Sequence, residues 1–134
     1  MKLIDGKGAV LGRLASYVAK QALRGEEVVI LNCEKVIITG NKKDIQDKFR
    51  EKRTKVGSGQ KGPKHSRNPE RIVKRTIRGM LPNHRRGRGK QALKKIMCYT
   101  GIPREFENEK KIVGGKEKIF KHIEIKDIFK WRKW

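Results

Sequence analysis

The sequence predicts an α/β fold that begins with a parallel strand–helix–strand unit. Apolar residues recur at helical spacing over residues 11–23, between a strand candidate at Lys2–Asp5 and the continuous apolar run Val28–Leu31. A strand that is apolar at every position is typical of a parallel sheet covered on both faces. Two strands joined by a helix within about thirty residues form a parallel crossover unit. This combination places the chain in the α/β class.

The first elements have well-marked ends. We expect a turn at residues 6–8, and we expect the first helix to end at Gly25, because glycine is the commonest residue just after a helix. Residues 36–38 are predicted either to extend the second strand or to follow it as a further strand.

A second helix is predicted to begin at Asn41, and its apolar face soon ends. Between Arg50 and Arg71 the chain is basic and interrupted by Gly and Pro, and Val56 is the only sizeable apolar side chain other than proline. We therefore predict that residues 52–67, approximately, form a basic extension that lacks its own core and becomes ordered on a partner.

The helix predicted from Pro69 to Met80 has an apolar face and an opposite cationic face. Asn68 is a good N-cap residue, Pro69 suits the first helical position, and Glu70 is favourable in the first turn. The expected apolar stripe consists of Pro69, Ile72, Val73, Thr76, Ile77 and Met80. The expected cationic face consists of Arg71, Lys74, Arg75 and Arg78.

Gly79 and Pro82 are expected to end that helix, and residues 83–90 are nearly all cation and glycine. We predict a short loop here that lies along phosphates, because glycine lets a backbone come close and arginine forks onto oxygens. A helical stretch at residues 91–97 then leads to a short strand at 96–99.

The last part of the chain is predicted to contain a polar surface loop at residues 105–118, approximately. The apolar residues between 119 and 131 predict a strand followed by a C-terminal helix that docks on the sheet. A length of 134 residues corresponds to one domain.

The charge is strongly positive and concentrated. The chain has 36 Lys and Arg against 14 Asp and Glu, a net charge of +22. Eighteen basic and two acidic residues lie between Lys48 and Lys95, so +16 of this charge falls in about a third of the sequence. An excess of this size favours a surface that binds nucleic acid over a merely solvated cationic face. The residues expected to bind are Arg13, Lys42, Lys43, Arg53, Lys55, Lys61, Lys64, His65, Arg67, Arg71, Lys74, Arg75, Arg78, His84, Arg85, Arg86, Arg88, Lys90 and Lys94.

Folded RNA is the expected partner. No aromatic residue occurs between Phe49 and Tyr99, so base stacking is not available where the charge is densest, and contact should be with the RNA backbone and its shape. A reader of duplex DNA would need a recognition helix with base-contacting side chains and usually a dimer seam. The sequence indicates neither, and we expect no homo-oligomer.

A small phosphate- or nucleotide-binding enzyme is the alternative that residues 6–13 raise. Glycines between a strand and a helix stand in the right order for binding an anion at a helix N-terminus. Their spacing fits neither the Walker motif, which needs Lys and then Ser or Thr where Arg13 and Leu14 stand, nor the dinucleotide-binding fingerprint. No Ser, His and Asp group stands at a recognisable spacing, so we expect no catalysis and no cofactor.

Two further expectations concern the cysteines and the cell compartment. Cys33 and Cys98 have no second Cys or His at ligand spacing, which predicts two reduced, buried thiols and no metal. The N-terminus has no apolar run of signal-peptide length, and no window approaches 18 apolar residues. We therefore expect a soluble, intracellular protein without membrane contact.

Seven short stretches in the first hundred residues, approximately, form a collinear pattern typical of a known family. They are IDG at 4–6, LGRLAS at 11–16, VILNCEK at 29–35, TGNK at 39–42, RTK at 53–55, RTIRGMLP at 75–82 and YTGIP at 99–103. The Arg-Gly-Met-Leu-Pro box at 78–82 is highly specific. On these stretches the chain resembles the large-subunit ribosomal protein thirteen family in its archaeal and eukaryotic form.

The resemblance implies a three-layer α/β/α fold with a mostly parallel four-stranded sheet. It also implies a structural, non-catalytic role in the cytoplasm: the protein would bind large-subunit ribosomal RNA beside neighbouring ribosomal proteins, aid assembly, and take no small-molecule substrate. Regulatory binding of messenger RNA by the same surface is a further alternative, which the residues do not distinguish from ribosomal binding.

Overall fold

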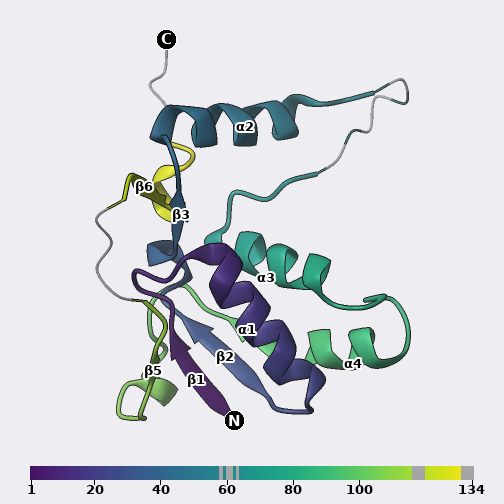
Figure 1. The fold of residues 1–134 in the computed structure, drawn as a ribbon, viewed down its shortest axis with the longest axis vertical. Coiled ribbons are helices and arrows are strands. Elements are labelled where there is room, and N and C mark those ends of the chain that lie inside the picture. Colours follow the sequence, from purple (N-terminus) through teal and green to yellow (C-terminus); the bar gives the residue numbers. More distant parts are fainter. Residues whose placement is uncertain (58, 60–61, 63, 116–119, 131–134) are drawn as a thin grey trace.

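The computed structural model describes residues 1–57, 59, 62, 64–115 and 120–130. Its main sheet has four strands in the order β4-β2-β1-β5, and each neighbouring pair is parallel (Figure 1). The strands are β1 (Lys2–Asp5), β2 (Val28–Leu31), β4 (Ile96–Cys98) and β5 (Ile112–Val113). The expected mostly parallel sheet and its first crossover unit are therefore confirmed.

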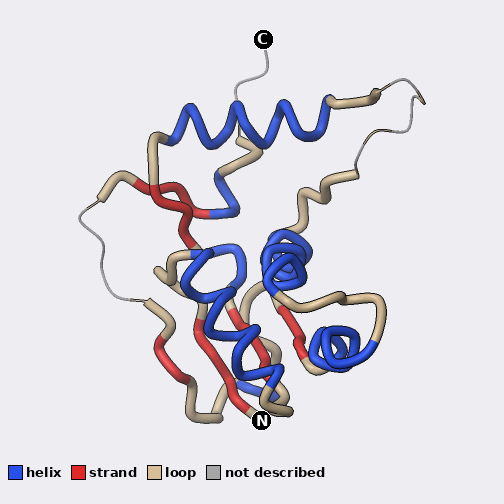
Figure 2. The backbone as a smooth tube through the Cα atoms, turned by 45° about the vertical axis from the view of Figure 1, so that its right-hand side comes forward, coloured by secondary structure: helices blue, strands red, loops and turns tan. Residues whose placement is uncertain are grey.

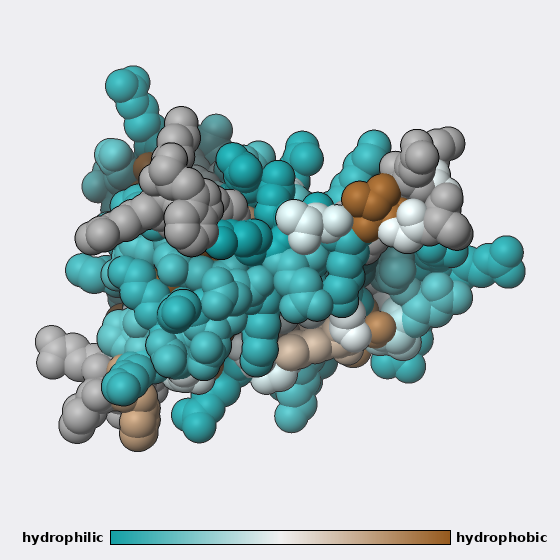
Figure 3. Space-filling view, turned by 90° about the horizontal axis from the view of Figure 1, so that it is seen from above, coloured by the Kyte–Doolittle hydropathy of each residue, from teal (hydrophilic) through white to brown (hydrophobic). Residues whose placement is uncertain are grey.

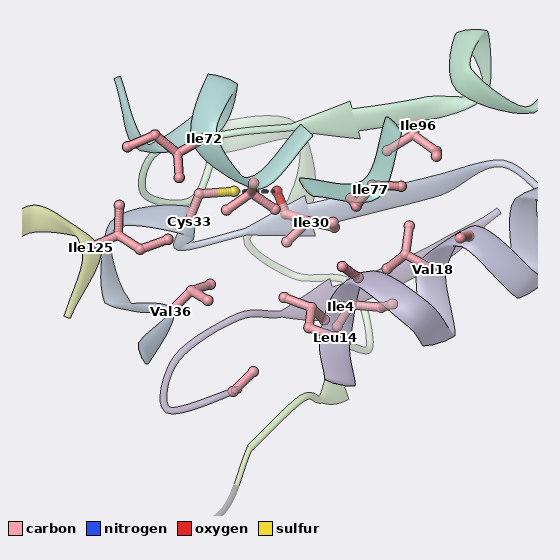
Figure 4. Close-up of a cluster of buried hydrophobic side chains, with 14 of the residues drawn as sticks. Ile4, Leu14, Val18, Ile30, Cys33, Val36, Ile72, Ile77, Ile96 and Ile125 are labelled. Atoms are coloured by element: carbon pink, nitrogen blue, oxygen red, sulfur yellow. Dashed lines mark hydrogen bonds between the residues drawn. The ribbon is translucent and has the colours of Figure 1, made fainter. Parts of the chain in front are cut away.

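Three helices cover one face of this sheet (Figure 2). They are α1 (Leu11–Leu23), α3 (Pro69–Met80) and α4 (Gly87–Lys94). Ile4 of β1 and Ile30 of β2 are buried in this layer together with Val18 of α1 and Ile77 of α3 (Figure 4). Gly25 follows α1 with a φ of +94°, in the left-handed conformation that the predicted helix end requires.

The opposite face of the sheet has a thin cover. Val29 and Leu31 of β2 pack there with Phe106, and Tyr99 lies beside them. Phe106 belongs to η2 (Arg104–Phe106), which is one turn of 3-10 helix. The ring centroids of Tyr99 and Phe106 are 6.0 Å apart. Because successive β2 residues alternate between this cluster and the helix layer, all four of them are buried.

A smaller assembly lies at the other end of the molecule (Figure 1). Strands β3 (Ile37–Thr39) and β6 (His122–Glu124) pair in antiparallel fashion, and helix α2 (Lys42–Thr54) contacts β6. Phe49 of α2 meets Phe129 edge to face, with 5.9 Å between ring centroids. None of the described helices is long and apolar enough to cross a membrane.

The predicted loop at residues 83–90 is wrong from residue 87 onward, because Gly87–Lys94 is the helix α4. Gly89 is buried where the start of α4 folds back on the chain before it, and a Cβ at Gly89 would overlap the carbonyl oxygens of Pro82 and Asn83. Gly89 therefore allows two parts of the protein backbone to pack closely. The neighbouring residues in the sequence do not show whether a glycine serves this purpose or lets the backbone approach a phosphate.

The predicted surface loop at residues 105–118 was also wrong in part. It contains the buried Phe106 and the two-residue strand β5, which extends the main sheet beside β1. The strand consists of only Ile112 and Val113, which is too short for an alternating apolar pattern to mark it. Residues 116–118 of this loop lie outside the described residues.

The strand predicted near the C-terminus is confirmed as β6, whereas no C-terminal α-helix occurs within residues 120–130. The 3-10 turn η3 (Ile125–Asp127) follows the strand and packs near η1 (Cys33–Lys35) instead of on the main sheet. The Ile125 N–H donates to the Val36 carbonyl at 2.9 Å. Residues 131–134 of the predicted helix lie outside the described range.

Smaller differences concern helix ends. Asn41 caps α2 as expected, since its side chain accepts a hydrogen bond from the Lys43 N–H. Asn68 precedes α3 but makes no side-chain cap, and Met80, predicted in the apolar stripe, is 44% exposed. Helix α2 continues to Thr54, so its last turn falls within the range predicted as an extension.

Candidate nucleic-acid interface

Helix α3 carries buried apolar residues on one side and cations on the other, as predicted. Ile72, Val73 and Ile77 are buried against α1 and the sheet. Arg71 and Arg75 are exposed, and Lys74 and Arg78 are half-buried. Within the described part of the chain, none of the ion pairs involves any of these four cations. No carboxylate of the described residues therefore neutralises the charge of this face by an ion pair.

A hollow of about 490 Å³, here called the cationic groove, lies where α3 faces α2 and the residues that precede α3. The basic side chains lining it are Lys52, Lys64, His65, Arg71, Lys74, Arg75 and Arg78. None of the described residues that line the groove is Asp or Glu. Such a hollow attracts anions, because several cations share it and no carboxylate opposes them.

Two arginines hold the backbone that forms one wall of this groove. A guanidinium N–H of Arg53 on α2 donates to the carbonyl of His65, and one of Arg75 on α3 donates to the carbonyl of Lys64 at 3.0 Å. Both arginines were predicted as contacts for nucleic acid. The structure adds a role inside the protein for each, although each guanidinium has further N–H donors.

The surroundings of His65 disfavour the charged form of its imidazole. Burial lowers the pKa of His65 below its usual value, and the nearby charges of Arg75, Lys52 and Arg53 lower that pKa further. The neutral ring can both donate and accept a hydrogen bond inside a groove whose other polar side chains mainly donate.

Sequence reasoning missed Lys52 as a groove residue. Its ammonium lies 5.5 Å from the ring centroid of Phe49, one helical turn earlier on α2, and it faces the groove. The i, i+3 spacing from Phe49 could have indicated this position. Phe49 is itself packed against Phe129 and covered by Lys52, so its ring is no free stacking platform.

A second group of predicted residues lies beyond the groove, around the start of α4. His84, Arg85 and Arg86 precede the helix and Arg88, Lys90 and Lys94 belong to it; of the six, His84 is half-buried and the rest are exposed. Figure 1 shows residues 64–67, α3 and the turn before α4 along the same side of the molecule. Seen from the α2 end, the described surface is hydrophilic apart from small apolar patches (Figure 3).

Several predicted residues stand apart from the groove. Lys42 and Lys43 begin α2, and Arg13 lies in the first turn of α1. Lys55 forms an exposed ion pair with Glu51 at 3.6 Å. Arg67 is exposed just before α3, and Lys61 lies outside the described residues.

The turn at residues 6–8 does not present free amides for a phosphate. The Gly6 N–H donates to the Leu31 carbonyl at 2.8 Å, the Gly8 N–H donates to the Lys35 carbonyl at 3.2 Å, and the Lys7 N–H donates to its neighbour Asp5. A phosphate-binding loop needs such N–H groups directed at the ligand. The three amides of this turn are therefore not available to a phosphate.

The two cysteines share one site. Cys33 is buried, with its Sγ 3.7 Å from the Ile30 carbonyl oxygen (Figure 4), whereas Cys98 is half-buried instead of buried as predicted. The neighbouring Cys98 thiol and burial both raise the pKa of the Cys33 thiol well above its usual value. A thiol held neutral in this way is inert as a nucleophile. The described residues form no cluster of three or more His, Cys, Asp or Glu that could hold a metal ion.

The wall formed by residues 64 and 65 can be tested separately from RNA contact. Replacing both Arg53 and Arg75 with Ala should raise the rate of tryptic cleavage after Lys64 in the free protein by roughly tenfold, since hydrogen bonds from charged donors contribute about 1.5 kcal/mol or more. Arg71→Ala is the matched control, because it removes an exposed α3 guanidinium with no recorded bond to this wall. Equal cleavage rates in both variants would contradict the positioning role.

Comparisons with known proteins assign the chain to a family. The family model described as "Ribosomal protein L13" matches residues 1–105. The chain is 44% identical over 133 residues to "Large ribosomal subunit protein uL13" of Methanocaldococcus jannaschii, covering 97% of this chain and 96% of that protein. The proteins of the same name from Thermoplasma volcanium and Methanococcus maripaludis are 48% identical over 110 residues and 49% identical over 106 residues. These alignments cover 82% and 77% of this chain, and 79% and 77% of the respective relatives. The chain that carries this cationic groove therefore belongs to the ribosomal protein L13 family.

Proposed function

We propose that this protein is a structural constituent of the large ribosomal subunit and binds ribosomal RNA through the cationic groove. Its family and its archaeal relatives are named as ribosomal proteins of the large subunit. It works in the cytoplasm, where large subunits lie, in contact with ribosomal RNA and other ribosomal proteins. It acts as a single copy and takes no small-molecule substrate.

The observation that carries this proposal is the convergence of cations from α2, α3 and the intervening segment on a hollow lined by no described carboxylate. Arg71, Lys74 and Arg78 repeat along α3 at spacings of three and four residues, so one rigid helix presents positive charge along a line. A linear array of cations on a packed helix fits the phosphates of a nucleic-acid strand.

The basic residues in and beside the groove divide between two tasks. Arg71, Lys74 and Arg78 contact phosphates, while Arg53 and Arg75 hold the wall that presents Lys64. His65, whose surroundings disfavour its charged form, hydrogen-bonds a ribose hydroxyl or a phosphate. The exposed cations around the start of α4 enter a crevice between RNA strands and extend the same surface.

Folded RNA fits this surface better than unstructured RNA. Successive bases of a single strand are usually stacked on aromatic side chains, and the one Phe, Tyr or Trp among the described groove residues, Phe49, is covered by Lys52. Recognition through phosphates and shape is the mode expected for structured RNA.

The enzyme alternative has no support. The chain belongs to a ribosomal protein family, and the amides of the 6–8 turn are already hydrogen-bonded within the protein. Regulatory binding of messenger RNA would use the same groove. Sedimentation of a native extract separates the two RNA functions, because the ribosomal role places the protein in large subunits and not in lighter messenger complexes.

The groove assignment is tested by the salt dependence of RNA affinity. Replacing Arg71 and Arg78 with Ala should weaken binding to large-subunit ribosomal RNA by roughly tenfold at moderate salt. It should also reduce the slope of log affinity against log salt concentration by about 1.4 to 1.8, because each lost phosphate contact contributes about 0.7 to 0.9. The measurement is a series of binding titrations at increasing salt.

The matched control removes two exposed cations that lie outside the groove. Lys7 and Lys110 lie in the turn after β1 and in the segment before β5. The double variant Lys7→Ala, Lys110→Ala changes net charge equally and should leave the slope within about half of one contact of the wild-type value. Equal slope changes in the two double variants would mean that net charge alone sets the salt dependence of RNA affinity, and they would overturn the groove assignment.

A further inference from the structure

A second hollow, here called the Phe120 hollow, has a volume of about 480 Å³ and shares no lining residue with the cationic groove. Its lining comes from the start of α1, the end of β3 and the residues that lead into β6. The lining residues are Val10, Arg13, Thr39, Gly40, Phe120 and Lys121. Its volume falls in the range of roughly 300–1,000 Å³ that is usual for small-ligand sites.

The aromatic ring in this hollow is unusually open to solvent. Phe120 is 70% exposed, whereas the other three phenylalanines of the chain are buried or half-buried. Its backbone is nonetheless fixed: the Phe120 carbonyl oxygen lies 2.8 Å from His122 Nδ1, and the Gly40 N–H donates to the carbonyl of Lys121 at 2.9 Å. A fixed backbone with an exposed ring is an arrangement that suits stacking.

The charge around this ring is positive. Arg13 and Lys121 are both exposed, and none of the described lining residues is Asp or Glu. The first turn of α1, which contains Arg13, has no acidic residue either. A ligand that fills the hollow must therefore combine a flat apolar face with negative charge.

We infer that the Phe120 hollow binds one unpaired RNA nucleotide, whose base stacks on the Phe120 ring while its phosphate lies between Arg13 and Lys121. This inference rests on the proposed RNA-binding function and adds to it a contact of different chemistry. Thr39 supplies a hydroxyl for a polar group of the nucleotide. The cationic groove contacts the phosphates of folded RNA and fits its shape, whereas the Phe120 hollow binds a base that is unpaired in the folded RNA.

An apolar side chain of a neighbouring protein is the competing occupant. It would leave the two cations without a partner, since Val10 and Phe120 are the only large apolar side chains among the described lining residues. A nucleotide uses the ring and both charges at once. The observations therefore favour RNA.

Substitutions at Phe120 distinguish stacking from plain apolar contact. The probe is a ten-nucleotide oligouridylate, titrated against the full chain carrying Arg71→Ala and Arg78→Ala so that the groove contributes little. Phe120→Leu should lower affinity by about fivefold to a hundredfold, because leucine keeps apolar area but has no π face, and Phe120→Trp should retain affinity. Since the ring is 70% exposed, both variants should fold as the parent does.

A crosslinking measurement locates the base independently. With 5-iodouridine at the centre of the same probe, irradiation of the wild-type protein should attach the probe at Phe120 and not at Tyr17, an exposed aromatic outside the hollow. Unchanged affinity in Phe120→Leu, or crosslinking at Tyr17 alone, would overturn the inference and leave the hollow to a protein neighbour. If instead Arg71→Ala with Arg78→Ala leaves the salt slope on ribosomal RNA unchanged, the groove proposal fails, whatever the result at Phe120.

Discussion

Replacing Gly89 with Ala should lower the free energy of unfolding by about 3 kcal/mol, at the upper end of what overpacking usually costs. A Cβ at Gly89 would overlap the backbone oxygens of Pro82 and Asn83, and backbone cannot rotate away as a flexible side chain can. The start of α4 must then shift away from the chain before it, and the cations of this turn move with it. Equilibrium unfolding in urea measures the loss, and RNA titrations of the folded fraction should show weaker binding.

Gly79 provides the matched control for this substitution. It lies in α3, and a Cβ there would meet no atom within 4 Å. Gly79→Ala should therefore raise stability by up to about 1 kcal/mol, because alanine is the better helix former. If the two variants changed stability equally, the close approach at Gly89 would carry no energetic cost, and the packing role assigned to Gly89 would be wrong.

The contrast between these two glycines shows what local pattern can and cannot predict. Both stand in basic, helix-forming stretches, and the residues around them do not reveal which one meets another part of the backbone. The first crossover unit and the two faces of α3 were predictable, because each rests on apolar periodicity repeated over several turns or on a fully apolar strand. Such signals are local and do not depend on how the chain later folds back.

Features built from distant residues escaped prediction. Strand β5 has two exposed residues and exists because it pairs with β1, more than a hundred positions away. The stacking site at Phe120 likewise depends on Arg13, which only the fold brings to the same hollow.

The cationic face of α3 was predictable as a set of residues and not as a division of tasks. Clustering of charge correctly placed Arg71, Lys74 and Arg78 on one helix face. Clustering could not show that Arg53 and Arg75 also donate hydrogen bonds to backbone carbonyls, twelve and eleven positions away in the sequence. In the composition, these two arginines look the same as any exposed arginine. Hydrogen bonds between elements are decided by tertiary geometry, so they separate residues that composition treats alike.

Truncating Ile77 to Ala should lower the free energy of unfolding by about 3 to 4 kcal/mol, because the side chain has no solvent exposure and its loss leaves a cavity between α3, α1 and the sheet. The change removes no charge. In buffer without denaturant, where the variant remains folded, the slope of log RNA affinity against log salt concentration should therefore equal that of the wild-type protein. Thermal or urea unfolding measures the first quantity, and titrations at several salt concentrations measure the second.

Met80→Ala is the control on the same helix. Met80 belongs to the same predicted stripe but is 44% exposed, so its truncation should cost less than about 1 kcal/mol. A folded Ile77→Ala protein with a reduced slope would mean that core packing sets the number of phosphate contacts. The apolar and cationic faces of α3 would then act as one unit, and the effect of Arg71→Ala with Arg78→Ala could no longer be assigned to charge alone.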